Sequence, residues 1–221
     1  MKLTCEYSRF TCAAYLVAAI LLVVCSILIA KGEDVLWINH NHTPFLDSFM
    51  VFVTQLGAGF LFLPLLIVLL FVRFRYAVLT VLVWIGHGVV CAILKRGVFG
   101  PVKRPAALLD NSLLYFVPDV DVHSFFSFPS GHTATIFCFA FLLSLLIKKR
   151  WATVGFLLIA LSVGYSRIYL LQHFLIDVAW GAMIGVLFTY FVWSYFETAK
   201  LPTWMDRFIK INRDLSLRVT I

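Results

Sequence analysis

Apolar residues fill long stretches of this chain, and polar and charged residues gather in the short segments between them. A helix needs about 20 mostly apolar residues to cross the hydrocarbon core of a bilayer. Stretches of this kind predict six membrane-spanning helices, at residues 11–30, 52–72, 76–94, 133–148, 151–170 and 175–195. We therefore expect an all-α integral membrane protein with a single domain over residues 1–221, whose last part, about 200–221, is a polar tail.

The overall composition agrees with that pattern. Of the 221 residues, 62% are hydrophobic and only 13% are charged, which is typical of a membrane protein. The sequence shows no internal repeat and no segment with the composition of a soluble domain. The pattern gives no indication of the oligomeric state.

Lysine and arginine are distributed unevenly between the two sides of the predicted bundle. Cytoplasmic loops of membrane proteins retain an excess of these residues. If the N-terminus is cytoplasmic, twelve of the eighteen basic residues lie on the cytoplasmic side. They are Lys2, Arg9, Arg73, Arg75, Lys148, Lys149, Arg150, Lys200, Arg207, Lys210, Arg213 and Arg218. The bias predicts a multi-pass protein of the inner (plasma) membrane with both termini in the cytoplasm.

The remaining basic residues fall on the opposite, extracytoplasmic side. They are Lys31, Lys95, Arg96, Lys103, Arg104 and Arg167. All but Lys31 lie in two of the polar segments described below. The net charge of +7 is explained by the orientation and by anionic lipid headgroups, so no nucleic-acid partner is expected.

A first polar segment, SRIYLLQHFLID at 166–177, interrupts the apolar second half of the chain. On a continuous helix, Ser166, His173 and Asp177 would share one stripe, with Arg167 about a quarter-turn away. An aspartate four residues after a histidine can accept a hydrogen bond from one imidazole nitrogen and leave the other one basic. This pattern favours a histidine prepared as a base or nucleophile. The alternative is a buried polar cluster that joins two helices.

A second segment, FSFPSGHTAT at 126–135, lies where a polar loop meets the fourth predicted span. Ser130 is expected to cap that helix, and the amides of its first turn, beginning at Gly131, would point outward as anion donors. His132 would lie at the mouth of this phosphate cradle, where it can protonate a departing oxygen. The alternative is an ordinary helix cap followed by a solvated histidine.

A third segment, LKRGVFGPVKRPAAL at 94–108, gathers four cations after the third span. A guanidinium binds phosphate oxygens through two parallel hydrogen bonds, and a lysine adds a compact positive charge. The cluster therefore suits an anion with several oxygens. The alternative is a basic patch for lipid headgroups, which the extracytoplasmic position disfavours.

The cysteines and the other histidines add no chemistry. The five cysteines lie in or beside predicted spans without a CxxC spacing, so neither a metal site nor a disulfide is expected. His40 and His42 belong to a polar and aromatic segment suited to the membrane interface. His87, inside the third span, is expected to hydrogen-bond between helices.

Taken together, the three segments resemble the signature of the type 2 phosphatidic acid phosphatase family, which is related to the vanadium haloperoxidases and acid phosphatases. The family pattern is Lys, six residues, Arg-Pro; then Pro-Ser-Gly-His; then Ser-Arg, five residues, His, three residues, Asp. Residues 129–132 match the second motif in full, and residues 166–177 match the third at the required spacing. The first motif departs from the pattern, because eight residues separate Lys95 from Arg104, and Arg96 and Lys103 are alternatives for the lysine.

The resemblance implies that His173 attacks phosphorus and forms a phosphohistidine, that Asp177 orients it, and that His132 protonates the leaving group. It also implies a set of phosphate-binding residues: Lys95, Arg104, Ser130, Gly131 and Arg167. No metal and no other cofactor is implied. The site would lie at the extracytoplasmic ends of the third to sixth spans.

The resemblance and this position indicate a phosphatase for a lipid phosphate or diphosphate whose tail stays in the bilayer. A short chain without a large added domain favours a bacterial enzyme, so undecaprenyl diphosphate is the first expectation and lipid A the second. Phosphatidic acid and phosphatidylglycerol phosphate fit the same description. Two alternatives stay open: a phosphotransferase that passes the phosphoryl group to another lipid, and a transporter or scaffold that binds phosphate without cleaving it.

Overall fold

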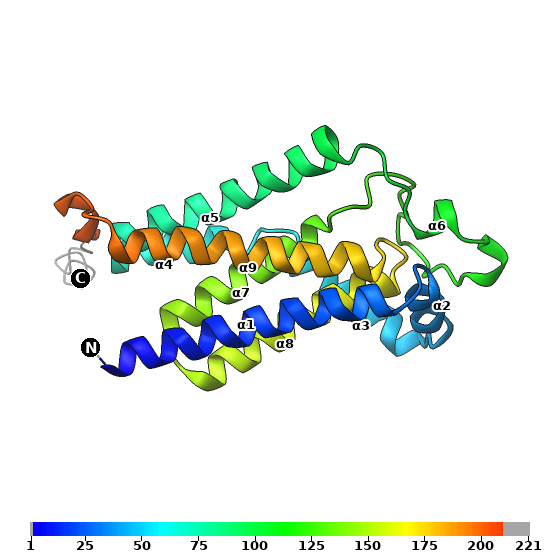
Figure 1. Cartoon of the computed structure of the whole chain (residues 1–221), viewed down its shortest axis with the longest axis horizontal. Coiled ribbons are helices and arrows are strands. Elements are labelled where there is room, and N and C mark those ends of the chain that lie inside the picture. Colours follow the sequence, from blue (N-terminus) through cyan, green and yellow to red (C-terminus); the bar gives the residue numbers. More distant parts are fainter. Residues whose placement is uncertain (1, 210–221) are drawn as a thin grey trace, which may run out of the picture.

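The structure is a computed structural model that describes residues 2–209 (Figure 1). Within this range the chain is all-helical, as the sequence predicts, and contains no β-strand. The α-helices are α1 (Lys2–Leu28), α2 (Glu33–His40), α3 (Pro44–Gln55), α4 (Phe62–Val72), α5 (Phe74–Ala92), α6 (Pro105–Leu108), α7 (Gly131–Ile147), α8 (Arg150–Tyr169) and α9 (Leu175–Thr198). A π-helical segment, Ile93–Val98, continues α5, and 3-10 turns form at Asn111–Leu113 and Thr203–Asp206.

Helix α7 lies inside the bundle and packs against α1, α5, α8 and α9. Its apolar side chains point in all directions, and most of them are buried by these neighbours. His87 of α5 contributes to this packing, because its Nε2 lies 2.9 Å from the Thr135 hydroxyl of α7. The expected role of His87 in helix packing is confirmed.

Helices α7 and α9 approach each other closely at two glycines of α9. A Cβ added at Gly181 would lie 2.5 Å from the carbonyl oxygen of Ser130, and one at Gly185 would lie 2.7 Å from that of Ala134. Small residues four apart on one helix face allow two membrane helices to come this close. The contact sets the start of α7 against the first turns of α9, so two of the three sequence motifs meet there.

Residues 52–72, predicted as one continuous span, form two helices instead. Helix α3 ends at Gln55 and α4 begins at Phe62. In the turn between them Gly59 has φ of +87°, and a Cβ at Gly57 would lie 3.0 Å from the carbonyl oxygen of His132. The break lets the chain pass directly over the start of α7. The prediction of a single helix was wrong because the apolar run conceals a turn that needs glycine at these positions.

Four helical segments among the described residues are long and apolar enough to cross a membrane. They are Tyr7–Leu28, Phe74–Val98, Arg150–Tyr169 and Leu175–Thr198. They match the first, third, fifth and sixth predicted spans. The regions of the second and fourth predicted spans contain shorter apolar helices, Phe62–Val72 and Gly131–Ile147.

The two ends of the bundle are formed by different parts of the chain (Figure 1). The start of α1 and the end of α9 lie at one end, where Arg73 and Arg75 each pair with Asp206 at 3.7 Å. At the opposite end lie α2, α6 and the loop 99–130, which carries the residues that lead into α7. Of the predicted polar tail, residues 200–209 are described, and residues 210–221 lie outside the described range.

Candidate active site

The segment 166–177 is a helix end, a turn and a helix start, and not the continuous helix assumed from the sequence. Helix α8 ends at Tyr169, and the backbone amides of Gln172 and His173 both donate to the carbonyl oxygen of Arg167. Leu171 adopts a left-handed conformation with φ of 56°. Ser166 consequently does not join the expected stripe, since its hydroxyl donates to the carbonyl oxygen of Val163.

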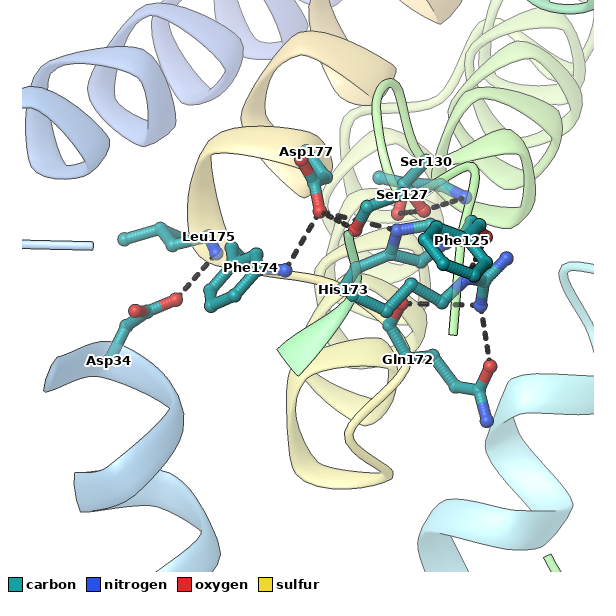
Figure 2. Close-up of polar contacts among 11 residues, drawn as sticks. Asp34, Phe125, Ser127, Ser130, Gln172, His173, Phe174, Leu175 and Asp177 are labelled. Carbon is teal, nitrogen blue, oxygen red and sulfur yellow. Dashed lines mark hydrogen bonds and ion pairs between the residues drawn. The ribbon is translucent and has the colours of Figure 1, made fainter. Parts of the chain in front are cut away.

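His173 and Asp177 nevertheless lie together, because the turn places the histidine directly before α9. Their side chains are buried, and His173 Nδ1 is 3.4 Å from Asp177 Oδ2. The same carboxylate oxygen accepts hydrogen bonds from the Ser127 hydroxyl and from the backbone amide of Phe174 (Figure 2). Asp177 is thereby fixed, and its negative charge faces Nδ1. The other ring nitrogen of His173, Nε2, is the one left for a substrate.

Burial lowers the pKa of His173 below its ordinary value, and the charges of Arg167 and Arg104 add to the effect. The nearby carboxylate of Asp177 acts in the opposite direction but does not outweigh burial. The imidazole is therefore neutral at physiological pH. A neutral imidazole has a free lone pair, which is the form required of a nucleophile.

The motif at 129–132 forms the start of α7. The Ser130 hydroxyl caps the helix, accepting from the Thr133 hydroxyl at 2.9 Å and from the Thr133 amide at 3.4 Å. The Ser130 amide donates to the carbonyl oxygen of Asp177, which ties this motif to α9. The amides of Gly131 and His132 make no hydrogen bond to the part of the chain that the structure describes. They are free to bind an anion at the positive end of the helix dipole.

The lysine of the first motif lies in the π-helical segment after α5. Lys95 is half-buried and lines the cavity described below, whereas Arg96 and Lys103 are exposed and do not line it. A π-helical turn is rare and often occurs at a functional site. Of the three cations that the sequence left open, the geometry favours Lys95.

Arg104, at the end of the first motif, lines the same cavity as Lys95. Its amide donates to the carbonyl oxygen of Ser124 at 2.9 Å, and the Ser127 amide donates to that of Val102 at 3.0 Å. These two bonds hold the end of the first motif beside the residues that precede the second. The Arg104 guanidinium is held by carbonyl oxygens of Phe125 and Gln172 and is largely buried.

Arg167 supplies a third buried cation. Its Nη1 donates to the Thr54 hydroxyl of α3 at 2.6 Å, and its side chain is only 7% exposed. Its buried Nε has no hydrogen-bond partner among the described residues. A buried guanidinium with an unused donor is costly unless a ligand satisfies it.

A cavity of about 470 Å³ brings these groups together. Of the eight residues predicted for the site, six line it: Lys95, Arg104, Gly131, His132, Arg167 and His173. Asp177 lies behind His173, and Ser130 is fully buried with its hydroxyl turned to Thr133, so neither lines the cavity. Three cations around one cavity repel each other, and an anion with several oxygens would relieve that repulsion.

Several contacts of the site were not found from the sequence. The Ser127 hydroxyl donates to Asp177, and the Gln172 side chain accepts from Arg104. The Thr54 hydroxyl, which lies outside all three motifs, accepts from Arg167. Asp34 of α2 accepts a hydrogen bond from the Leu175 amide at the start of α9 (Figure 2). Ser127 and Gln172 lie within two of the polar segments, but the motifs do not specify their identity, and Thr54 and Asp34 lie outside all three segments. The described residues also contain no group of three His, Cys, Asp or Glu side chains that could hold a metal ion.

The fold and the cavity define a membrane-bound enzyme of phosphoryl transfer. The chain belongs to the PAP2 superfamily, whose family model matches residues 76–201. Phosphatidylglycerophosphatase B of Bacillus subtilis (strain 168) is 31% identical, over 71% of this chain and 78% of that protein. The undecaprenyl-diphosphatase of Sulfolobus acidocaldarius is 28% identical, over 67% of this chain and 69% of that protein.

A solved structure agrees with these sequence matches. The crystal structure of Aquifex aeolicus LpxE has a TM-score of 0.66 and 32% sequence identity, and the match covers 76% of this chain and 96% of that one. The chain is a membrane lipid phosphatase of the metal-independent kind, and its resemblance to the family is confirmed.

Proposed function

We propose that this protein hydrolyses the terminal phosphoryl group of a membrane lipid through a phosphohistidine at His173. Nε2 attacks phosphorus, the bond between phosphorus and the leaving oxygen breaks, and His132 protonates that oxygen. Asp177 faces Nδ1 and stabilises the positive imidazole ring that forms. A water molecule then attacks phosphorus while His132 removes a proton from that water. The bond between phosphorus and Nε2 breaks, which restores the neutral His173 and releases inorganic phosphate.

The phosphate oxygens would be bound by Lys95, Arg104, Arg167 and the Gly131 amide. These donors point at the place where negative charge develops, and this arrangement lowers the barrier of phosphoryl transfer. The Ser130 hydroxyl would act indirectly, as the cap that fixes the start of α7. The observation that carries the proposal is that His132, His173 and three cations line one cavity.

We further propose that the chain crosses the membrane six times, with α3 and α4 together forming the second crossing and α7 the fourth. At 1.5 Å per residue, α7 is about 26 Å long, close to the hydrocarbon thickness of about 30 Å. An even number of crossings puts both termini on the same side of a single-domain protein, and the excess of lysine and arginine there makes that side the cytoplasm and the site extracytoplasmic. The start of α1 and the end of α9 lie at one end of the bundle, and α2, α6 and the loop 99–130 lie at the other, which supports this arrangement (Figure 1).

The direct test is phosphate release from a panel of lipids by the purified protein in detergent. The panel contains undecaprenyl diphosphate, lipid A, phosphatidylglycerol phosphate and phosphatidic acid, and we expect the first two to be the preferred substrates. Inorganic phosphate is measured beside lipid products, so transfer to a second lipid is distinguished from hydrolysis. Binding of all four lipids without release would instead support the transporter or scaffold.

We expect activity to survive a metal chelator. The cavity offers cations for the phosphate, and Asp177, behind His173, is occupied by Ser127, Phe174 and His173. Asp119 and Asp121 line the cavity on its exposed side, but the described residues include no group of three side chains there that could hold a metal ion. Phosphate release measured with and without EDTA should therefore differ by less than about twofold, whereas loss that magnesium restores would contradict the proposed site. Vanadate, which mimics the trigonal-bipyramidal transition state, should inhibit competitively.

The proposed orientation predicts which loops are reachable from outside the cell. In a variant without native cysteines, Ser124→Cys should react with an impermeant thiol reagent added to intact cells. Lys149→Cys, at the opposite end of the bundle, should react only after the cells are opened. Both positions are exposed, so accessibility within the fold does not decide the result. The reverse labelling pattern would contradict the extracytoplasmic site.

A further inference from the structure

Gln172, the residue before the proposed nucleophile, makes hydrogen bonds with both ends of its amide group. Its Oε1 accepts from Arg104 Nη1 at 2.6 Å, and its Nε2 donates to the carbonyl oxygen of Asp121 at 2.8 Å. The side chain is only 4% exposed. A buried amide whose donor and acceptor both have partners is held in one orientation.

The same contacts fix the guanidinium of Arg104. Nη1 donates to both the side-chain and the backbone oxygen of Gln172, and Nε donates to the carbonyl oxygen of Phe125 at 2.9 Å. Because both Nε and Nη1 have acceptors, the orientation of the Arg104 guanidinium plane is fixed. These bonds leave the Nη2 hydrogens of Arg104 for a ligand, and Arg104 lines the cavity.

We propose that Gln172 is a positioning residue, which orients Arg104 toward the transferred phosphate; this role rests on the phosphatase site proposed above. A guanidinium on a long side chain has many rotamers, and catalysis depends on donors held in place before the substrate arrives. Because Gln172 and His173 are consecutive in one turn, that turn sets the position of both the attacking nitrogen and a phosphate-binding cation. The nucleophile and its cation then keep a constant separation.

The bond to Asp121 extends this role to the loop beside the cavity. Asp119, Asp121 and His123 line the cavity on its exposed side. Gln172 attaches this loop to the turn that carries His173. The loop, the cation and the nucleophile are therefore connected through one side chain.

The test compares Gln172→Met with Asn41→Leu. Both variants replace an amide by an apolar side chain of similar size, and Asn41 bonds only to the carbonyl oxygen of Trp37 on α2, away from the cavity. We expect Gln172→Met to lower kcat/KM about 10- to 100-fold and to weaken vanadate inhibition by a similar factor. Asn41→Leu should leave both quantities at the parent value. A folded Gln172→Met variant with parental kcat/KM and vanadate inhibition would overturn the proposal.

A second variant separates positioning from packing. Gln172→Glu keeps an acceptor for Arg104, loses the donor to Asp121, and places a negative charge near the phosphate. We expect it to raise KM more than it lowers kcat, because the new carboxylate competes with the phosphate for Arg104. Equal losses in kcat for Gln172→Met and Gln172→Glu would contradict a role through Arg104.

A double-mutant cycle identifies the partner. Arg104→Lys removes the guanidinium that Gln172 orients. In this background Gln172→Met should therefore lower kcat/KM much less than it does in the parent. Full additivity of the two substitutions would overturn the proposal. Parental activity of Arg104→Lys and Arg104→Ala would instead contradict the phosphate-binding site itself, so the two failures are distinguishable.

Discussion

Replacement of His173 by alanine is expected to abolish phosphate release while the protein remains folded. His173 is paired with a buried carboxylate, whereas the other two histidines that line the cavity, His123 and His132, have no ion pair with a carboxylate among the described residues. Loss of a nucleophile that acts as a unit with its partners typically costs on the order of 10⁴-fold or more in kcat. The measurement is phosphate release at high enzyme concentration over long incubations.

His40→Ala is the matched control for this variant. His40 is exposed at the end of α2 and lines no part of the cavity, so its activity should equal that of the parent. With substrate labelled on the transferred phosphoryl group, the parent should accumulate an acid-labile, alkali-stable label on the protein when quenched rapidly. His173→Ala should not. Multiple turnover by a folded His173→Ala protein would refute the covalent mechanism.

Asp177→Asn is expected to give the second largest loss, about 10²- to 10⁴-fold in kcat, with a smaller change in KM. The substitution preserves the shape of the side chain but removes the charge that faces Nδ1. The carboxamide also presents either a donor or an acceptor to that nitrogen, and the wrong choice selects the wrong tautomer of His173. Steady-state kinetics on a preferred lipid gives both constants.

Two companion variants make the Asp177 result specific. Ser127→Ala removes one of the hydrogen bonds to the carboxylate and leaves its charge, so we expect a loss of only about tenfold in kcat. Asp206→Asn removes a carboxylate at the opposite end of the bundle, where it pairs with Arg73 and Arg75, and should leave kcat unchanged. Asp177→Asn with parental kcat would show that the carboxylate does not act on the histidine.

Six of the eight residues predicted for the candidate site line one cavity, and the sequence could indicate them because two of the motifs have fixed local spacing. A histidine and an aspartate four residues apart lie close in a continuous helix and also in the turn observed here. The sequence therefore predicted the contact of His173 with Asp177 correctly, although the continuous helix assumed for residues 166–177 was wrong. Ser130 and His132 followed from helix-capping chemistry in the same way. Local chemistry of this kind depends on few backbone angles, which explains why it is visible in a linear pattern.

The remainder depended on contacts between distant parts of the chain. The turn at 56–61 lies within an apolar run, so a hydropathy pattern does not reveal it. The need for glycine at position 57 comes from a carbonyl oxygen of α7, which leaves no room for a Cβ there. Thr54 and Asp34 act on Arg167 and on the start of α9 from elements outside the three motifs. The choice of Lys95 over Arg96 and Lys103 likewise required the direction of the π-helical segment.

The close contact of α7 and α9 also has a consequence for redesign of substrate preference. The helices that carry His132 and Asp177 meet at Gly181 and Gly185, where a side chain on either glycine would collide with backbone atoms of α7. Changes in specificity are therefore best sought in the cavity wall contributed by residues 119–123 and by Val51 of α3. A library at these positions that leaves Asp121, the partner of Gln172, unchanged can vary the accepted headgroup while the contacts that hold Arg104 and His173 are kept.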